Sequence, residues 1–337
     1  MRVLAAGDHF VRNSLIAEAL RHDITDASLD LTELTLPWPL EPFGRVAEVE
    51  EASDSEDALI AALDGVEVCV TQMAPFTERV LDAAPALKMI AVCRSWPVNI
   101  NVAAARERGV RVCCAPGRNA AATAEFTLGV MLAALRRIPD AHNSLTGKGH
   151  WDGSYYTYEH SGTELEDAPV GVLGYGAVGS RVARVLGAFG AQVEVYDPYV
   201  RGDVHGVRAP TLEAMLSRSR VLTLHARLTP ETRGMIGPHE LSLMPRGAVL
   251  VNTARGGLVD THALCDALDS GHLAAAALDV YEEEPPRPGS RLFSTPNLVL
   301  TPHVGGASRA VAQKAAAFIA AEVGRYARGE RLAHALV

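Results

Sequence analysis

Short apolar runs alternate with helix-like patterns along the first part of the chain. Four runs have the length and the residue types of buried strands: 2–5, 66–71, 88–93 and 110–116. Helical spacing in TERVLDAA and NVAAARERG separates the last three runs. Because strands covered on both faces read as continuous apolar runs, this alternation predicts a parallel sheet with helices on both sides. The proline-rich stretch LTLPWPLEPFG predicts a loop.

A second alternation starts at Pro169 and continues almost to the end of the chain. Its expected strands are PVGVLG, AQVEVYD, RVLTLH, GAVLVNTA, AAAALDVY and NLVLTPH. Helical patterns separate most of them, and a last long helical pattern covers 308–328. The chain therefore reads as two α/β units in series, each built on a parallel sheet.

The two alternations are joined by a long apolar helix and a polar, aromatic segment. Residues 119–138 have apolar positions at helical spacing. The following GKGHWDGSYYTYEHSGTELED has no strong period and predicts an arm or connection.

Composition narrows the class of protein. A length of 337 residues suits two domains, and 48% apolar with 21% charged residues suits a globular enzyme. A net charge of −9 argues against a nucleic-acid partner. No apolar run approaches the roughly 18 residues of a membrane span, and the first run is too short for a signal peptide. We therefore expect a cytoplasmic protein with no membrane partner.

The five cysteines indicate neither a disulfide framework nor a metal site. Their number is odd and they lack paired C-x-x-C spacing. Cys69, Cys93 and Cys113 lie in apolar runs, which predicts small core side chains. A catalytic thiol is the alternative.

A glycine-rich turn opens the second unit. Gly174, Gly176 and Gly179 form G-x-G-x-x-G between an apolar strand and an amphipathic helix. This context predicts a dinucleotide site, in which backbone N–H groups approach the pyrophosphate. The turn's other residues, also expected at the cofactor, are Tyr175, Ala177 and Val178. The alternative is a tight turn with a purely structural role.

Asp197 lies about twenty residues beyond the turn, at the end of the next strand. An acid at this place accepts hydrogen bonds from the adenosine ribose, and its charge repels a 2′-phosphate. This favours NAD over NADP, although Arg201 is close enough to weaken the preference.

Three further stretches carry groups suited to hydride chemistry, each at the carboxyl end of an expected strand. They are VNTARGGLVD with Arg255, LDVYEEEPP with 282–284, and TPHVGG with His303. Ligands of open α/β sheets bind at these ends. Taken singly, Arg255 and Glu284 can also be an ordinary ion pair, and His303 a structural histidine at a strand end.

The motifs in their order resemble the D-isomer-specific 2-hydroxyacid dehydrogenases. The resemblance rests on GYGAVG, YDPY, HARLTPETRGMI, VNTARGGLVD, ALDVYEEEPP and TPHVGGAS, preceded by VNINVAAARERGVRVCCAPGRNAAATAEFTLGVMLA. It covers most of the chain and implies an NAD-dependent interconversion of a D-2-hydroxy acid and a 2-oxo acid.

The resemblance also implies a domain layout. Residues 1–118 plus 309–337 would form a flavodoxin-like substrate domain, and 119–308 a Rossmann NAD-binding domain inserted into it. The active site would lie in the cleft between them. Residues 119–168 would contribute the helix and arm of a homodimer interface.

Roles for single residues follow from the same resemblance. Arg255 would bind the substrate carboxylate and polarise the 2-oxo group, and His303 would be the acid–base, paired with Glu284. Asp279 would hold the nicotinamide carboxamide. Further residues expected to line the cofactor are His225, Thr232, Thr253 and Ala254.

The chain departs from the family in CRSWPVNI. Ser95 and Trp96 stand where small residues usually let backbone N–H groups reach the substrate. The Trp96 ring would either form a wall of the pocket or point away from it. Met73 and Ala74 are weaker substrate candidates, for which hydrophobic packing is the alternative.

Two other functions share this architecture. One is an NAD(H)-sensing, corepressor-like binding protein. The other is a relative with altered chemistry, such as a formate or phosphite dehydrogenase.

Overall fold

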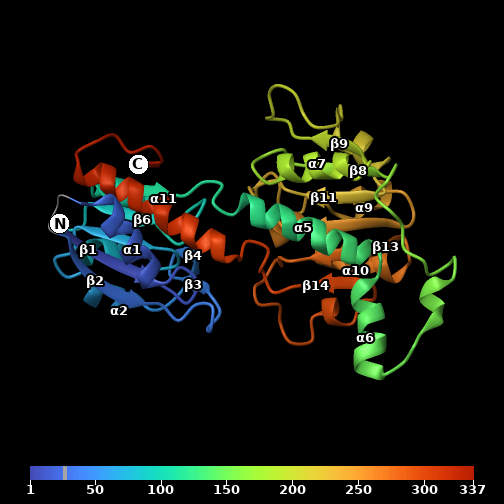
Figure 1. Ribbon diagram of the computed structural model, residues 1–337, viewed down its shortest axis with the longest axis horizontal. Helices are drawn as coiled ribbons and strands as arrows, with labels where there is room; N and C mark the ends of the chain where they lie inside the picture. The colour runs from blue at the N-terminus through green and yellow to red at the C-terminus, as the bar shows by residue number, and fades with distance from the viewer. Residues whose placement is uncertain (26–28) are drawn as a thin grey trace. The chain divides into compact units, whose positions relative to one another are not determined.

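The computed structural model describes residues 1–25 and 29–337. The chain divides into two compact units (Figure 1). Unit 1 comprises Met1–Arg118 and Ala307–Val337, and unit 2 comprises Asn119–Gly306. The chain thus leaves unit 1 once and returns to it for its last helix.

Unit 1 is built on a five-stranded parallel sheet in the order β2-β1-β5-β6-β7. The strands are β1 (Arg2–Gly7), β2 (Asp30–Thr35), β5 (Val68–Thr71), β6 (Met89–Val92) and β7 (Arg111–Cys114). Counted within this sheet, the order is 2-1-3-4-5, which is the flavodoxin-like arrangement. The expected parallel sheet is confirmed. The sequence pattern missed edge strand β2 and the small hairpin of β3 (Gly44–Val46) and β4 (Val49–Ala52).

Helices cover both faces of this sheet. Their bounds are α1 (Asn13–Asp23), α2 (Glu56–Ala62), α3 (Glu78–Ala83), α4 (Val102–Glu107) and α11 (Arg309–Ala327). Val3 packs in a core cluster with residues of α1 and α11, whereas Leu4 packs in a second cluster with residues of α2, α3 and α4. Successive side chains of a strand point to opposite faces, so the continuous apolar runs fill both cores. Figure 1 shows α11, in red, beside α1.

Unit 2 is built on a seven-stranded parallel sheet in the order β10-β9-β8-β11-β12-β13-β14. The strands are β8 (Pro169–Leu173), β9 (Gln192–Tyr196), β10 (Val207–Arg208), β11 (Val221–Leu224), β12 (Ala248–Asn252), β13 (Leu273–Leu278) and β14 (Leu298–Leu300). This is the Rossmann order with one added strand, and the order reverses between β8 and β11. The predicted doubly wound fold is confirmed.

Helices also cover both faces of the second sheet. They are α5 (Ala120–Leu135), α7 (Gly179–Ala188), α8 (Leu212–Leu216), α9 (Pro238–Leu243) and α10 (Thr261–Asp269). Residues of α5 and α7 share one core cluster, whereas residues of α8, α9 and α10 share another. The long helix expected over 119–138 ends earlier, because Arg137 has a left-handed backbone with φ +53°. A separate helix, α6 (Ile138–Lys148), then begins with Pro139 in its first turn.

Cys69, Cys93 and Cys113 are core residues, as expected. All five are buried and none forms a disulfide. Burial raises the pKa of Cys93 to about 12 and also raises that of Cys69, so both thiols are protonated at neutral pH. This argues against a catalytic thiol at either position.

No helix in the described residues is long and apolar enough to cross a membrane.

Candidate active site

The glycine-rich turn lies where the strand order of unit 2 reverses. Gly174 has φ +92°, and a Cβ there would come within 2.6 Å of the backbone N of Ala226, which follows β11. A Cβ on Gly179 would lie 2.0 Å from the carbonyl oxygen of Gly174. A Cβ on Gly176 would meet nothing within 4 Å. Two glycines therefore permit close packing, and the third leaves open space at the start of α7, which fits the pyrophosphate of a dinucleotide.

Asp197 follows β9 and is fixed beside this turn. Its Oδ2 accepts a hydrogen bond from the backbone N of Tyr175 at 2.8 Å, and its Oδ1 accepts one from Tyr199 N at 2.8 Å. Because a carboxylate oxygen can accept more than one hydrogen bond, Asp197 can also accept hydrogen bonds from the hydroxyls of a ribose. Tyr175 is held in turn, since its hydroxyl accepts from the backbone N of His205 at 2.7 Å.

The ends of β11 and β12 bring the other expected cofactor residues to the same edge. Burial lowers the pKa of His225 to about 3, so its imidazole is neutral, and its Nε2 lies 3.0 Å from Thr223 Oγ1. Thr253 and Thr127 share a hydrogen bond of 2.6 Å between their hydroxyls, which ties the β12 loop to α5. Thr232 lies in the loop after β11, where its hydroxyl donates to the carbonyl of Arg227 at 2.7 Å.

Arg255 follows β12 in a loop that several hydrogen bonds hold in place. Asn252 accepts from the backbone N of Ala254 at 3.1 Å and donates to the carbonyl of Arg255 at 2.9 Å. The guanidinium donates through Nη1 to the carbonyl of Ala254 at 2.7 Å. A Cβ on Gly256 would lie 1.9 Å from the carbonyl carbon of Tyr281, so only glycine lets the Arg255 loop approach the Glu284 loop this closely.

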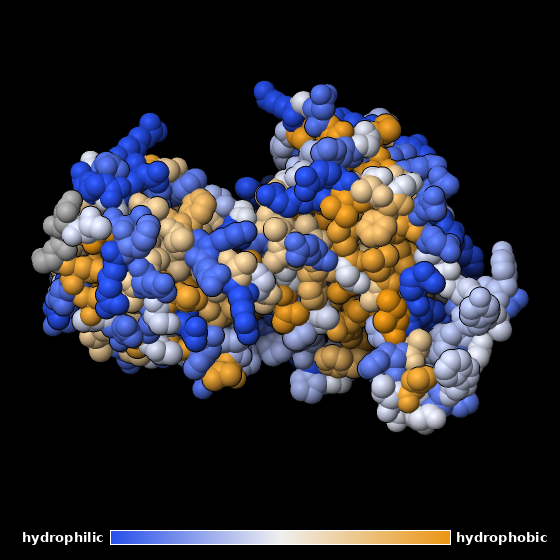
Figure 2. Space-filling view, in the orientation of Figure 1, coloured by the Kyte–Doolittle hydropathy of each residue, from blue (hydrophilic) through white to orange (hydrophobic). Residues whose placement is uncertain are grey.

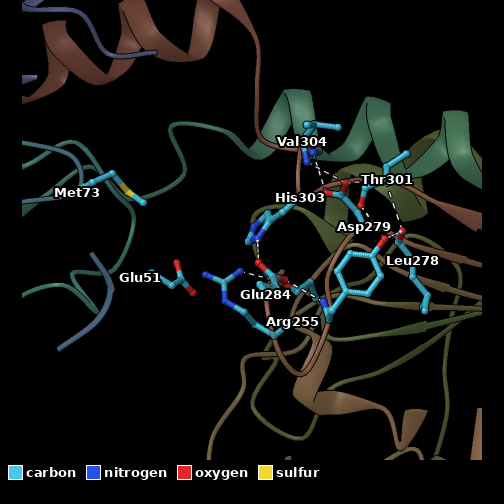
Figure 3. Close-up of polar contacts among 12 residues, drawn as sticks. Glu51, Met73, Arg255, Leu278, Asp279, Glu284, Thr301, His303 and Val304 are labelled. Carbon is cyan, nitrogen blue, oxygen red and sulfur yellow. Dashed lines mark hydrogen bonds and ion pairs between the residues drawn. The ribbon is translucent and has the colours of Figure 1, made fainter. Parts of the chain in front are cut away.

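His303 and Glu284, the two residues that the family resemblance implies as an acid–base pair, are in direct contact. His303 Nδ1 and Glu284 Oε2 are 2.6 Å apart, and both side chains are mostly buried (Figure 3). The other oxygen of Glu284 accepts from the backbone N of Tyr281 at 2.9 Å, which fixes the carboxylate. The short contact fixes the orientation of the imidazole ring.

The backbone of His303 is unusual. Its φ is +52°, in the left-handed region that non-glycine residues rarely adopt. Strained backbone of this kind is concentrated at functional sites, where the surrounding structure holds it in place.

Asp279 holds the segment that carries His303. It is only 1% exposed. Its Oδ1 accepts from Thr301 Oγ1 at 2.7 Å and from the backbone N of Val304 at 2.9 Å, and its Oδ2 accepts from Gly305 N at 2.7 Å. In Figure 3 the Asp279 carboxylate is turned toward Thr301 and Val304. These bonds bracket His303 on both sides, which sequence reasoning did not foresee.

Tyr281 was also missed. Its hydroxyl donates to the carbonyl of Thr301 at 2.9 Å, and its backbone N holds Glu284. Burial raises the pKa of Tyr281 to about 12, so the phenol remains a donor at neutral pH. One residue thus connects the Glu284 loop with the His303 segment. Its sequence signal is its position three residues after the end of β13.

The four substrate candidates of unit 1 differ in exposure. Met73 and Ala74 are 3% and 0% exposed and pack in the core cluster that includes Leu4. Ser95 is exposed, and Trp96 is 59% exposed. The Met73 sulfur accepts a hydrogen bond from Arg94 at 3.1 Å.

Within the described residues, no cluster of His, Cys, Asp or Glu has the arrangement needed to hold a metal ion. The edge of unit 2 instead offers a guanidinium, a carboxylate-paired imidazole and a glycine-rich turn. These groups can bind a carboxylate, exchange a proton and hold a dinucleotide.

The chain is similar to known proteins along most of its length. The family model of the D-isomer specific 2-hydroxyacid dehydrogenase NAD binding domain matches residues 128–305. The chain is 40% identical over 296 residues to D-3-phosphoglycerate dehydrogenase of Methanocaldococcus jannaschii, covering 86% of this chain and 55% of that protein. It is 42% identical over 275 residues to the enzyme of the same name from Mycobacterium bovis, covering 80% and 51%.

A solved structure of a protein from Thermus thermophilus has the same fold. It superposes with a TM-score of 0.84 at 31% identity and covers 100% of both chains. By contrast, the chain spans about half the length of the two curated relatives above. The family match spans the glycine turn, Arg255, Glu284 and His303 alike. The chain belongs to the D-isomer specific 2-hydroxyacid dehydrogenase family.

Proposed function

We propose that the chain is an NAD-dependent oxidoreductase that interconverts a D-2-hydroxy acid and a 2-oxo acid. The observation that carries the proposal is the contact of 2.6 Å between His303 and Glu284, at the same sheet edge as Arg255 and the glycine turn. It is tested by following NADH absorbance with a panel of 2-oxo acids.

The glycine turn, Asp197 and the loops after β11 and β12 would hold the cofactor. NAD(H), when bound, accepts or supplies the hydride. The open space at Gly176 takes the pyrophosphate, and Asp197 takes the ribose hydroxyls. Ala177, Val178, His225, Thr232, Thr253, Ala254 and Asp279 are proposed to line the rest of the site. For Asp279 this adds a cofactor contact to the three hydrogen bonds it already accepts.

The proton is handled by His303. During reduction, protonated His303 donates from Nε2 to the substrate oxygen that becomes the hydroxyl. Glu284 holds Nδ1, so Nε2 is the nitrogen available to the substrate. During oxidation, neutral His303 takes the proton back. Glu284 stabilises the imidazolium in both directions.

Arg255 is proposed to bind the substrate. A planar guanidinium binds a carboxylate through two parallel hydrogen bonds and places a positive charge beside the 2-oxo oxygen. The hydrogen bonds made by Asn252 and the close approach at Gly256 fix the loop, which keeps this grip oriented.

Unit 1 is proposed to be the substrate domain. Ser95, Trp96, Met73 and Ala74 would contact the part of the substrate beyond the carboxylate. For Met73 and Ala74 the burial described above supports core packing as a second role. The curated relatives named above are D-3-phosphoglycerate dehydrogenases, and a phosphorylated acid is one substrate to include in any panel.

A homodimer is proposed from the surface of unit 2. Helix α5 is apolar around most of its circumference, and Figure 2 shows apolar atoms along it. Large apolar side chains remain exposed on α6 and the arm: Ile138, Leu145, Trp151, Tyr156 and Tyr158. Exposed apolar surface of this extent marks an interface, and a second copy of the chain is the proposed partner. We also propose a cytoplasmic location. It is supported by the five cysteines, which are buried and form no disulfide.

The choice of cofactor can be tested at Asp197. NADH should support turnover far better than NADPH, because the carboxylate repels a 2′-phosphate. Asp197→Ala should reduce the ratio of kcat/KM for NADH over NADPH by about tenfold or more. Asp266→Ala, which removes an exposed carboxylate from α10, is the matched control and should leave the ratio unchanged. Equal efficiency with both cofactors in the unmodified protein would contradict the role of Asp197.

The Glu284 carboxylate can be tested through the pH profile. Reduction needs protonated His303, so its rate falls as the pH rises. Glu284→Gln removes the negative partner and makes the imidazolium less stable. The fall should therefore occur at lower pH in Glu284→Gln, measured as kcat/KM for reduction between about pH 5 and 9. A profile that does not move would remove Glu284 from the proton step.

A further inference from the structure

The carbonyl oxygen of Thr301 accepts two hydrogen bonds beside the proposed acid–base residue. The backbone N of His303 donates to it at 3.0 Å, and the hydroxyl of Tyr281 donates to it at 2.9 Å. Pro302, which has no N–H group, is the middle residue of the resulting three-residue turn. The Tyr281 hydroxyl is therefore bound to the same atom as the backbone of His303.

The backbone of Tyr281 holds the partner of His303. Its N donates to Glu284 Oε1 at 2.9 Å, while Glu284 Oε2 lies 2.6 Å from His303 Nδ1. Together with the two hydrogen bonds at Thr301, these contacts close a ring that begins and ends at Tyr281. The ring fixes the distance between the carboxylate and the imidazole, because displacing either group lengthens a hydrogen bond.

The Tyr281 hydroxyl has Thr301 as its main acceptor. The carbonyl of Leu278 is farther away, at 3.4 Å, and already accepts from the backbone N of Thr301 at 3.0 Å. Tyr281 is half-buried, and burial raises the pKa of its phenol to about 12. The hydroxyl therefore keeps its proton at neutral pH and remains a donor to the Thr301 carbonyl.

The backbone of His303 depends on support from both sides. Its φ of +52° lies in the left-handed region, which residues other than glycine rarely adopt. Asp279 accepts from the backbone N of the two residues that follow His303, and so fixes the chain after it. Asp279 also accepts from the Thr301 hydroxyl, whereas the Thr301 carbonyl is held by Tyr281. The Tyr281 hydroxyl thus supports the chain on the side before His303.

We propose that Tyr281 is a positioning residue for the proton step. Its hydroxyl, through the Thr301 carbonyl, holds the His303 ring in contact with its carboxylate partner. Tyr281 acts through His303 and exchanges no proton with the substrate. The inference rests on the proposed dehydrogenase function, in which His303 is the acid–base group, and it adds the residue that keeps this group in place.

Tyr281→Phe tests this role, because it removes one oxygen atom and keeps both the ring and the backbone N that binds Glu284. It should lower kcat for 2-oxo acid reduction by about three- to thirtyfold, since a small displacement of a reacting group slows the reaction. KM for NADH should be unchanged, because the glycine turn is unaltered. Steady-state kinetics measures both quantities.

The pH profile separates positioning from a loss of stability. The charged side chains of unit 2 labelled near His303 in Figure 3 are Glu284, Asp279 and Arg255, and Tyr281→Phe keeps all three. A shifted profile therefore reports a changed contact between His303 and Glu284. The fall of kcat/KM with rising pH should occur at lower pH than in the unmodified protein, in the direction expected for Glu284→Gln but by a smaller amount.

The position of the ring can also be measured without turnover. In protein with isotope-labelled histidine, the imidazole nitrogen NMR resonances of His303 are assigned by their loss in His303→Asn. In Tyr281→Phe, the Nδ1 resonance should move toward its position in Glu284→Gln, because the same contact is weakened.

Tyr326→Phe is the matched control. The Tyr326 hydroxyl lies in unit 1, where it donates to Glu67 Oε1 at 3.0 Å, and burial raises the pKa of its phenol to about 12 as well. Removing this hydroxyl should leave kcat, the pH profile and the His303 resonances unchanged, whatever its effect on the melting temperature.

A purely structural role of Tyr281 predicts different results. Tyr281→Phe would then lower the melting temperature and leave the pH profile and the Nδ1 resonance as they are in the unmodified protein. That outcome, in a protein that reduces 2-oxo acids, would overturn this inference alone. Failure of the unmodified protein to reduce any 2-oxo acid would overturn the proposed function and this inference with it.

Discussion

Replacing His303 by asparagine should lower kcat for 2-oxo acid reduction by about 10²–10⁴-fold, the usual contribution of a general acid–base group. Asparagine is chosen because His303 has φ +52°, a backbone conformation that asparagine tolerates better than alanine. The loop should therefore keep its shape while the proton donor is lost. Steady-state turnover measures the loss, and fluorescence titration with NADH checks that cofactor affinity is retained.

The matched control for this variant is His262→Asn, at an exposed histidine of α10 in the same unit. It should keep full activity. Combining Glu284→Gln with His303→Asn should cost little more than His303→Asn alone, because the carboxylate acts through the imidazole. A His303→Asn protein that retains most of its rate would show that the proton comes from another group.

Replacing Arg255 by glutamine should lower kcat/KM for 2-oxo acids by about 10²–10⁴-fold, since two charge-assisted hydrogen bonds to the substrate carboxylate are lost. Arg255→Lys keeps the charge but not the planar fork, so its activity should lie between those of Arg255→Gln and the unmodified protein. Steady-state kinetics over a wide range of substrate concentration separates the effects on KM and kcat.

Arg220→Gln is the control for Arg255, because Arg220 is an exposed arginine between α8 and β11 of unit 2. NADH affinity should be unchanged in all of these variants. If Arg255→Gln reduces 2-oxo acids with an unaltered KM, the carboxylate must be bound elsewhere.

Much of the scaffold could be predicted from apolar runs. Buried parallel strands are apolar on both faces, so β1, β5 and β8 were visible as continuous stretches. Edge strand β2, with sequence DLTELT, is only partly buried and carries polar residues. Its pattern of apolar and polar positions is therefore hard to distinguish from that of a loop. The break between α5 and α6 at Arg137 depends on a left-handed backbone that no apolar pattern encodes.

The residues of the candidate site were predicted from strand ends and from the order of the motifs. The hydrogen bonds that hold these residues in place were not predicted. Arg255, Glu284 and His303 lie where polar residues follow apolar strands, a signal that sequence carries. The three hydrogen bonds of Asp279 and the link from Tyr281 to Thr301 join loops more than 19 residues apart. Such contacts arise only when the sheet aligns the ends of β13 and β14.

Residues at the carboxyl edge of the unit 2 sheet, with His303 as the acid–base group, are proposed to carry out hydride and proton exchange on a 2-oxo acid. The most direct measurement is NADH-dependent reduction of a panel of 2-oxo acids by the unmodified protein, with the configuration of the product determined by chiral chromatography. The account predicts consumption of NADH with at least one acid and a product of the D configuration. Tight binding of NADH with no turnover on any acid, as expected of an NAD(H)-sensing protein, would contradict it.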